Sequence, residues 1–253
     1  MDIGFILTGL VVGGLVGLTG VGGGAIMTPM LILGFGIAPI VAVGTDLLYA
    51  AISKSSGVIV HHHHNHVQWS IVKLFALGSL PAAVFTSLFL SHISSEFYEG
   101  MLQTLMGIML LLTAMTLFAR PYLQNSLRRY RLQGLKRDII TIVSGATLGV
   151  LVTLTSVGAG ALGVALISLL YPQLSSRRMV GTDLAHAVPL TAVAGIGHWQ
   201  LLGSVDWHLL VGLLIGAIPG IMLGSLLTVR IPPVLLRNIL ATLLLLLGLR
   251  FAF

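Results

Sequence analysis

Two aspartates lie inside long apolar stretches of this chain, and both belong to the same short motif. Residues 43–47 read VGTDL, and residues 180–184 read VGTDL again. An ionisable side chain costs about 3 kcal/mol at the centre of a membrane span, so Asp46 and Asp183 are candidates for a functional role. Either carboxylate could carry a proton, or hold Na⁺ together with Thr45 or Thr182. The alternative is structural, because Thr-Asp near a helix start can accept hydrogen bonds from free backbone N–H groups and orient a loop.

Two glycine-rich breaks recur at a matching offset. TGVGGGA at 19–25 aligns with TSVGAGA at 155–161. Glycine costs roughly 1 kcal/mol relative to alanine inside a helix, so we predict that one half-helix ends and another begins at each break. The free N–H groups and positive dipole end of such a half-helix suit an anion, whereas the alternative is close helix packing through small residues. The candidate substrate-binding residues at the breaks are Gly22, Gly23, Gly24, Gly158, Ala159 and Gly160.

The two halves differ just after the shared motif, where a site for an asymmetric substrate should differ. Tyr49 and Lys54 correspond to His186 and Thr191. Lys54 is a candidate cation for an anionic substrate, or a lysine that extends to the membrane interface. His186 follows Asp183 by three residues and shares its helical face. It is a candidate proton carrier or hydrogen-bond donor to substrate, or a histidine satisfied in the core.

The run HHHHNH at 61–66 contains the residue type that ligates Zn, Ni and Cu. It lies at the end of an apolar segment, with no acidic or cysteine partner nearby, so we interpret it as a polar loop at the membrane interface. His198 aligns roughly with His61, which suggests a shared interfacial position. We therefore expect no metal centre and no cofactor.

The composition indicates that helices in a bilayer position these residues. The chain has 253 residues, of which 56% are hydrophobic and 8% are charged, whereas an average soluble domain is about 25% charged. The mean hydropathy is +1.04, and the long apolar stretches are typical of membrane helices rather than of an outer-membrane barrel. We interpret the net charge of +6 as a topology signal and expect no nucleic-acid partner.

The apolar segments predict an all-α polytopic membrane protein with roughly eight to ten hydrophobic segments. They cover approximately 3–19, 25–35, 39–60, 69–91, 98–119, 139–154, 161–171, 178–199, 206–228 and 232–252. Segments 25–35 and 161–171 are too short to span about 30 Å of hydrocarbon. The shared landmarks divide the chain into a first repeat (1–119), a basic linker (120–138) and a second repeat (139–253).

Charge predicts how these repeats are oriented. If each half crosses the membrane an odd number of times and the linker is cytoplasmic, twelve of the thirteen Lys and Arg residues lie on or near that side. We therefore expect two inverted repeats with glycine-broken half-helices and both termini outside. The alternative, one broken helix per half, gives parallel repeats and places Arg177 and Arg178 outside.

The order of these motifs resembles the sulfite exporter TauE/SafE family of membrane permeases. The resemblance rests on GLVGLTGVGGG at 14–24 and VGTDL about twenty residues later, both duplicated after a basic mid-chain loop. It implies a transporter of the bacterial or archaeal cytoplasmic (inner) membrane that moves anionic sulfur compounds such as sulfite or sulfoacetate. The family's glycine motif maps onto Gly22, Gly23 and Gly24 and, in the second half, onto Gly158 and Gly160. Ser156 and Ala159 depart from that pattern.

We therefore predict a secondary transporter, not an enzyme, that binds a small anion between the two glycine breaks and works by alternating access. The sequence contains no nucleotide-binding motif, so we expect proton or sodium coupling rather than ATP. The alternative is a divalent-metal permease in which Asp46, Asp183 and His186 converge. An intramembrane hydrolase that uses the two aspartates, and a structural or sensory membrane protein, are further classes.

Overall fold

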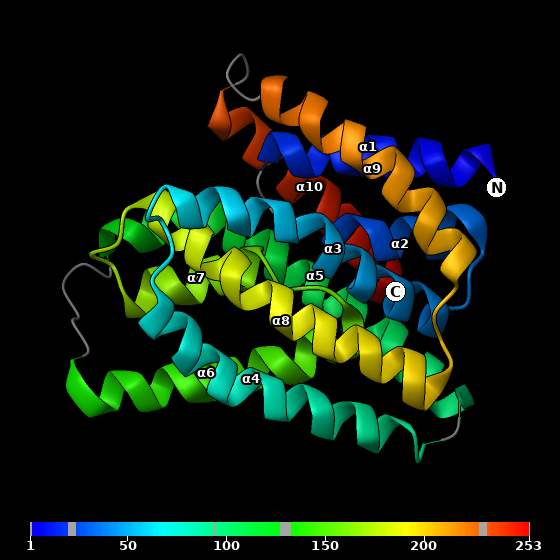
Figure 1. Cartoon of the computed structure of the whole chain (residues 1–253), viewed down its shortest axis with the longest axis horizontal. Coiled ribbons are helices and arrows are strands. Elements are labelled where there is room, and N and C mark those ends of the chain that lie inside the picture. Colours follow the sequence, from blue (N-terminus) through cyan, green and yellow to red (C-terminus); the bar gives the residue numbers. More distant parts are fainter. Residues whose placement is uncertain (1, 20–23, 94, 127–132, 228–231, 253) are drawn as a thin grey trace.

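This computed structural model describes residues 2–19, 24–93, 95–126, 133–227 and 232–252. The described residues form α-helices and contain no strand (Figure 1). In chain order the helices are α1 (Ile3–Thr19), α2 (Gly24–Phe35), α3 (Pro39–His63), α4 (Trp69–Leu90), α5 (Ser95–Ser126), α6 (Gly134–Thr155), α7 (Ala161–Leu170), α8 (Ser176–Leu202), α9 (Trp207–Leu227) and α10 (Pro233–Ala252).

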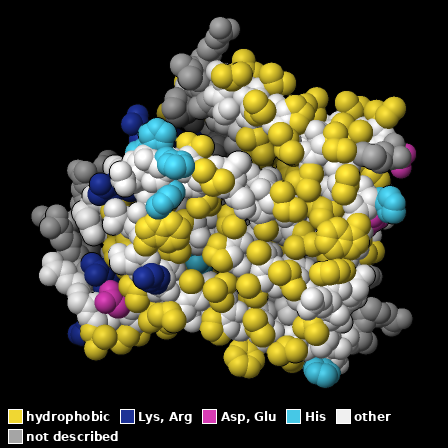
Figure 2. All heavy atoms as spheres, viewed as in Figure 1, with side chains coloured by type: hydrophobic (Ala, Val, Ile, Leu, Met, Phe, Trp, Pro, Cys, Tyr) yellow, Lys and Arg dark blue, Asp and Glu magenta, His cyan; other side chains and the backbone are white. Residues whose placement is uncertain are grey.

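Six of these helices are long and apolar enough to cross a membrane, and they are α4, α5, α6, α8, α9 and α10. α1, α2 and α7 are apolar but shorter. Large apolar side chains lie exposed along the long helices, with Phe85 and Leu226 each 72% exposed. Hydrophobic side chains cover much of the face in Figure 2. Because such a surface suits lipid rather than water, the chain is a multi-pass membrane protein, as its composition predicts.

The short helices belong to two helical hairpins. The start of α1 lies against the end of α2, where the rings of Phe5 and Phe35 have centroids 5.2 Å apart. At the corresponding positions of α6 and α7, the hydroxyls of Thr141 and Tyr171 are 3.0 Å apart. α2 and α7 therefore return toward the side from which α1 and α6 start, so Gly24, the first residue of α2, and the break before α7 lie at the far ends of the two hairpins.

Each hairpin packs along a long helix of the other half through closely approaching backbones. α1 lies beside α9 along the upper edge of Figure 1, and α4 lies beside α6 along the lower edge. A Cβ atom on Gly9 would strike the carbonyl of Leu213, and one on Gly145 would strike the carbonyl of Phe75. Gly9 aligns with Gly145 and Phe75 aligns with Leu213, so each half presents an equivalent surface to the other.

α3 and α8, which carry the two VGTDL motifs, lie next to each other in the centre of the molecule (Figure 1). Gly195 of α8 contacts Leu48 of α3, and Gly57, farther along α3, contacts Leu184, earlier in α8. The two helices therefore run antiparallel. α5 and α10 also pack against each other, so the corresponding helices of the two halves pair at two places.

The observed helices match the apolar segments predicted from the sequence, with ends that shift by a few residues. The largest differences fall at the predicted linker, because α5 extends to Ser126 and α6 begins at Gly134. Basic and polar residues there continue the helices beyond the apolar cores. Residues 127–132 of the linker, together with Gly22 and Gly23 of the first break, lie outside the described residues.

Candidate substrate site

The two glycine breaks meet inside the protein. Gly24 is the first residue of α2, and Ser156 follows the last residue of α6. A Cβ atom on Gly24 would strike the carbonyl oxygen of Ser156 and lie 3.2 Å from Oδ2 of Asp46. The backbones of the two breaks are therefore in contact, and the position of Gly24 has no room for a side chain.

The second break turns sharply through residues with positive φ. Ser156 has a φ of 57°, Gly158 of 110° and Gly160 of 141°. The last two conformations favour glycine because it has no Cβ atom. Gly160 immediately precedes α7, so the glycine pattern predicts this interruption correctly.

Asp46 connects three parts of the structure at this point. Its side chain is fully buried in α3. Oδ2 accepts a hydrogen bond from the Thr28 hydroxyl of α2 at 2.6 Å and another from the Ser156 hydroxyl at 2.9 Å. Oδ1 has no hydrogen-bond partner within the described parts of the chain. Asp46 therefore holds α2, α3 and the second break together, and one of its oxygens is left for another ligand.

Asp183 lies at the other short helix. Its side chain is 2% exposed, and a Cβ atom on Gly163, in the first turn of α7, would strike its Oδ1. Each carboxylate thus lies near the start of the short helix of its own half. Negative charge is favourable at a helix N-terminus because the helix dipole is positive there.

Lys54 reaches from α3 to the second break. Its side chain is 5% exposed, and its ammonium donates a hydrogen bond to the carbonyl of Ala159 at 2.7 Å. Its charge interacts with both Asp46 and Asp183. A lysine that extends to the membrane interface would keep its charge in water, so the buried contact contradicts that alternative reading of Lys54.

His186 and Tyr49 occupy corresponding positions in the two halves, and both are buried. Nε2 of His186 is 2.8 Å from the Ser79 hydroxyl of α4, and its ring centroid is 5.2 Å from that of Phe75. His186 also interacts electrostatically with Lys54, and Tyr49 does so with Asp46. The Tyr49 hydroxyl has no hydrogen-bond partner among the residues described. Both side chains therefore belong to the same charged interior as the two aspartates.

Thr45 and Thr182 connect the two halves of the chain. The Thr45 hydroxyl accepts a hydrogen bond from the N–H of Asp206 at 3.1 Å, and the Thr182 hydroxyl accepts one from the N–H of Gln68 at 3.0 Å. Gln68 and Asp206 occupy equivalent positions, just before α4 and α9. The sequence did not predict this reciprocal pair of contacts, because it depends on how the two halves dock.

The histidine run forms the last turn of α3 and the turn that follows it. His62, His63 and His64 are exposed, as expected of a polar loop. His198 is fully buried, with Nε2 3.0 Å from the Thr153 carbonyl and Nδ1 3.1 Å from the Ser204 hydroxyl. No three His, Asp or Glu side chains in the described ranges could together hold a metal ion. The divalent-metal alternative therefore lacks its ligand set there.

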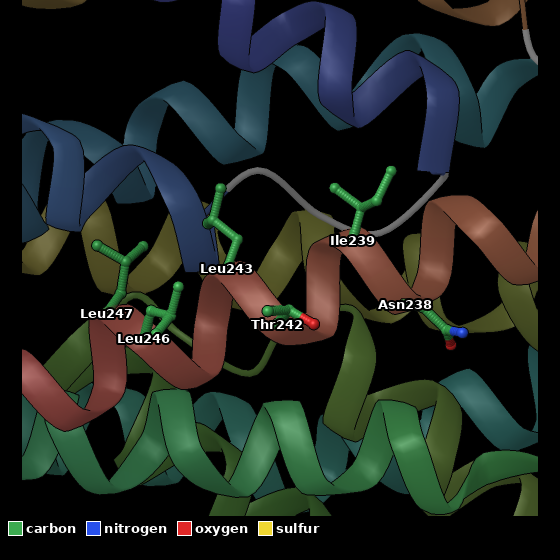
Figure 3. Close-up of a pocket in the computed structure, with 6 residues that line it drawn as sticks. All are labelled: Asn238, Ile239, Thr242, Leu243, Leu246 and Leu247. Atoms are coloured by element: carbon green, nitrogen blue, oxygen red, sulfur yellow. The ribbon is translucent and has the colours of Figure 1, made fainter.

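An apolar groove of about 570 Å³ lies on α10, away from these residues (Figure 3). Asn238, Ile239, Thr242, Leu243, Leu246 and Leu247 line it. Ile239 is 53% exposed and Leu246 is 63% exposed, so the groove belongs to the apolar outer surface. None of the predicted substrate-binding residues lines it, and it has no charged side chain for an anion.

Comparisons with known proteins agree with the resemblance in the sequence. The family described as "Sulfite exporter TauE/SafE" matches residues 5–251. "Probable membrane transporter protein YjnA" of Bacillus subtilis is 40% identical over 257 residues, which cover 99% of each chain. "Probable membrane transporter protein YdhB" of the same organism is 28% identical, covering 92% of this chain and 93% of the relative.

A "Probable membrane transporter protein" of Xylella fastidiosa is 27% identical, covering 88% of this chain and 84% of the relative. No solved structure gives a significant match to the chain. The match to the family extends through both glycine breaks, both VGTDL motifs and the helices that position them. The chain is therefore a membrane transporter that belongs to the sulfite exporter TauE/SafE family.

Proposed function

We propose that this transporter binds a small anion where the two glycine breaks meet and moves it across the bacterial or archaeal cytoplasmic membrane. The family's description favours a sulfur oxyanion or organosulfonate such as sulfite or sulfoacetate. One observation carries this proposal. The ammonium of Lys54 is buried and bonded to the Ala159 carbonyl at the second break. An arriving anion could replace that carbonyl as the partner of a charge that is already desolvated.

The short helices supply the rest of the attraction. α2 and α7 begin at the two breaks, so the partial positive charges at their N-termini add to the charge of Lys54. A trigonal or tetrahedral oxyanion offers several acceptor oxygens to such donors. The substrate-binding residues that we propose remain Gly22, Gly23, Gly24, Thr45, Tyr49, Lys54, Gly158, Ala159, Gly160, Thr182 and His186. The two threonines contribute through the contacts between the halves, because turn N–H groups already occupy their hydroxyls.

We infer that the two halves are inverted repeats. The antiparallel packing of α3 on α8 supports this, because parallel repeats would place corresponding helices in the same direction. The contacts of α1 with α9 advance in the same direction along both helices, from Gly9 with Leu213 to Gly13 with Ala217. α1 therefore runs parallel to α9, a helix of the other half that corresponds to α4 and not to α1. The charge distribution further supports a cytoplasmic linker with both termini outside.

This arrangement supports a mechanism of alternating access. The two halves contact each other at equivalent surfaces. The hydrogen bonds from the N–H of Asp206 to Thr45 and from the N–H of Gln68 to Thr182 lie toward opposite ends of the α3–α8 pair. Rocking one half against the other can open one end while the other stays closed. The anion between the breaks is then exposed to one side of the membrane at a time.

Ligand-dependent thermal stability tests the proposal. Purified protein is heated with sulfite, sulfoacetate, methanesulfonate, sulfate or acetate, since a ligand that binds the folded state stabilises it by RT ln(1 + [L]/Kd). We expect a sulfur oxyanion or sulfonate to stabilise the wild type and Lys73→Gln, a variant of an exposed lysine on α4. Lys54→Gln should lose the effect. Equal stabilisation of all three proteins would contradict an anion site at Lys54.

A further inference from the structure

The buried charges around the two breaks do not balance. Asp46 is 0% exposed, Asp183 is 2% exposed and Lys54 is 5% exposed. Among the described residues, no other Asp, Glu, Lys or Arg side chain is buried. With both carboxylates ionised the interior therefore carries one net negative charge. An uncompensated charge is costly in a low-dielectric interior, so the empty site reaches neutrality when the two carboxylates share one proton.

A bound anion changes this balance by its own charge. When a monoanion joins Lys54, the interior is neutral only if both carboxylates are protonated. His186, bonded to Ser79 beside Lys54, adds no charge in its neutral form. Going from a neutral empty site to a neutral loaded site thus requires one additional proton for each negative charge on the substrate. Without that proton, the carboxylates would repel the anion.

The hydrogen bonds of Asp46 suit it to receive this proton. Oδ2 of Asp46 accepts from both Thr28 and Ser156, whereas Oδ1 is buried and has no partner in the described part of the molecule. A proton on Oδ1 leaves both bonds to Oδ2 intact and makes Oδ1 a donor. In this scheme the proton of the empty site stays on Asp183, and the proton that is added with the anion goes to Asp46.

The groups that face Asp46 come from every element around it. α2 contributes Thr28, and the turn between α6 and α7 contributes Ser156. α3 itself contributes Tyr49 and Lys54. Lys54 also interacts with Asp183 of α8, so its charge acts on both carboxylates. The opposing positive charge near Asp46 is therefore the ammonium that the substrate anion would also use.

We propose that Asp46 is the coupling site, and that each monoanion binds together with one proton on its Oδ1. This inference rests on the proposed anion site between the breaks. The proton–carboxyl bond at Oδ1 forms on binding and breaks on release, and the proton comes from the aqueous side to which the site is open. Anion and proton then move in the same direction without net charge, so an inward proton gradient drives uptake. Export of the anion requires an outward anion gradient that is larger than the inward proton gradient.

Methanesulfonate is a suitable probe because it stays a monoanion throughout the working pH range. Its Kd is measured calorimetrically at several pH values, and proton uptake on binding is measured in weak buffer with an indicator dye. For the wild type we expect about one proton taken up per anion, and a Kd that rises up to about tenfold per pH unit as Asp46 loses its proton. Asp183→Asn and the surface variant Asp138→Asn should keep that dependence on pH.

Asp46→Asn should bind methanesulfonate independently of pH, with the affinity that the wild type has at low pH. Its amide oxygen can still accept from Thr28 and Ser156 while its NH₂ imitates the protonated oxygen. Binding without proton uptake in the wild type, or an unchanged pH dependence in Asp46→Asn, would overturn the coupling site but leave the anion site standing. No binding of methanesulfonate by the wild type at any pH would overturn both.

Discussion

Removing the Lys54 charge should destabilise the protein, and removing one carboxylate as well should restore part of the loss. In Lys54→Met the Ala159 carbonyl loses its donor at 2.7 Å, which costs about 1–3 kcal/mol for a buried group left unpaired. The two carboxylates also lose the cation that interacts with both of them. Breaking a buried charge pair from one side costs about 3–5 kcal/mol. The single variant should therefore lose several kcal/mol of unfolding free energy.

The double variant Lys54→Met, Asp46→Asn removes a negative charge together with the positive one. Its remaining penalty should approach the cost of the unpaired carbonyl alone, about 1–3 kcal/mol. The two substitutions should thus be strongly non-additive. Unfolding free energies come from titration of the purified proteins with SDS in mixed micelles. Lys73→Met, at an exposed lysine on α4, is the control and should change stability by about 0.5 kcal/mol or less. Additive effects, or a Lys54 variant as stable as the control, would refute the balance of buried charges among Lys54, Asp46 and Asp183.

Two further predictions concern the contacts that position the site. Gly24→Ala should lower thermal stability and abolish anion binding, because its Cβ atom would strike the Ser156 carbonyl. Gly34→Ala in the same helix, where a Cβ atom meets nothing within 4 Å, should stabilise the protein by up to about 1 kcal/mol in the same thermal assay. Thr45→Val and Thr182→Val should each cost about 0.5–1.5 kcal/mol in the SDS titration. These two costs should add in the double variant, because the contacts are separate; a large cost at only one threonine would contradict their equivalence.

The sequence predicted the helices well because the residue types change where the helices begin and end. Apolar stretches end where polar or glycine residues begin, and helices of the observed lengths follow from that pattern. The hairpin arrangement was accessible only in part: segments 25–35 and 161–171 are too short to span the hydrocarbon, but the sequence left open whether they re-enter the membrane. The helix ends at the linker were harder to predict from the sequence. α5 and α6 continue into basic, polar sequence, where helix propensity rather than hydropathy decides the helix ends.

The candidate site was predictable in its charged residues but not in their partners. Asp46, Asp183 and Lys54 are recognisable because charge is rare in apolar segments. Thr28 gives no comparable signal, since a threonine is common in a membrane helix. Ser156 was visible only as a departure from the glycine pattern of the other break. That Lys54 reaches the Ala159 carbonyl depends on which helices pack together, and one sequence contains no direct record of that packing.

The two halves are alike where they support each other and unlike where they face the breaks. The backbone contacts of Gly9 and Gly145 correspond, and so do the threonine bonds between the halves. The position equivalent to Lys54 is Thr191, however, whose hydroxyl bonds within its own helix to the Ala187 carbonyl. This difference is expected if the two halves need equivalent surfaces to pack against each other. A small asymmetric anion, in contrast, needs only one cation. A second buried lysine would attract the substrate more strongly but would oppose its release on the far side of the membrane.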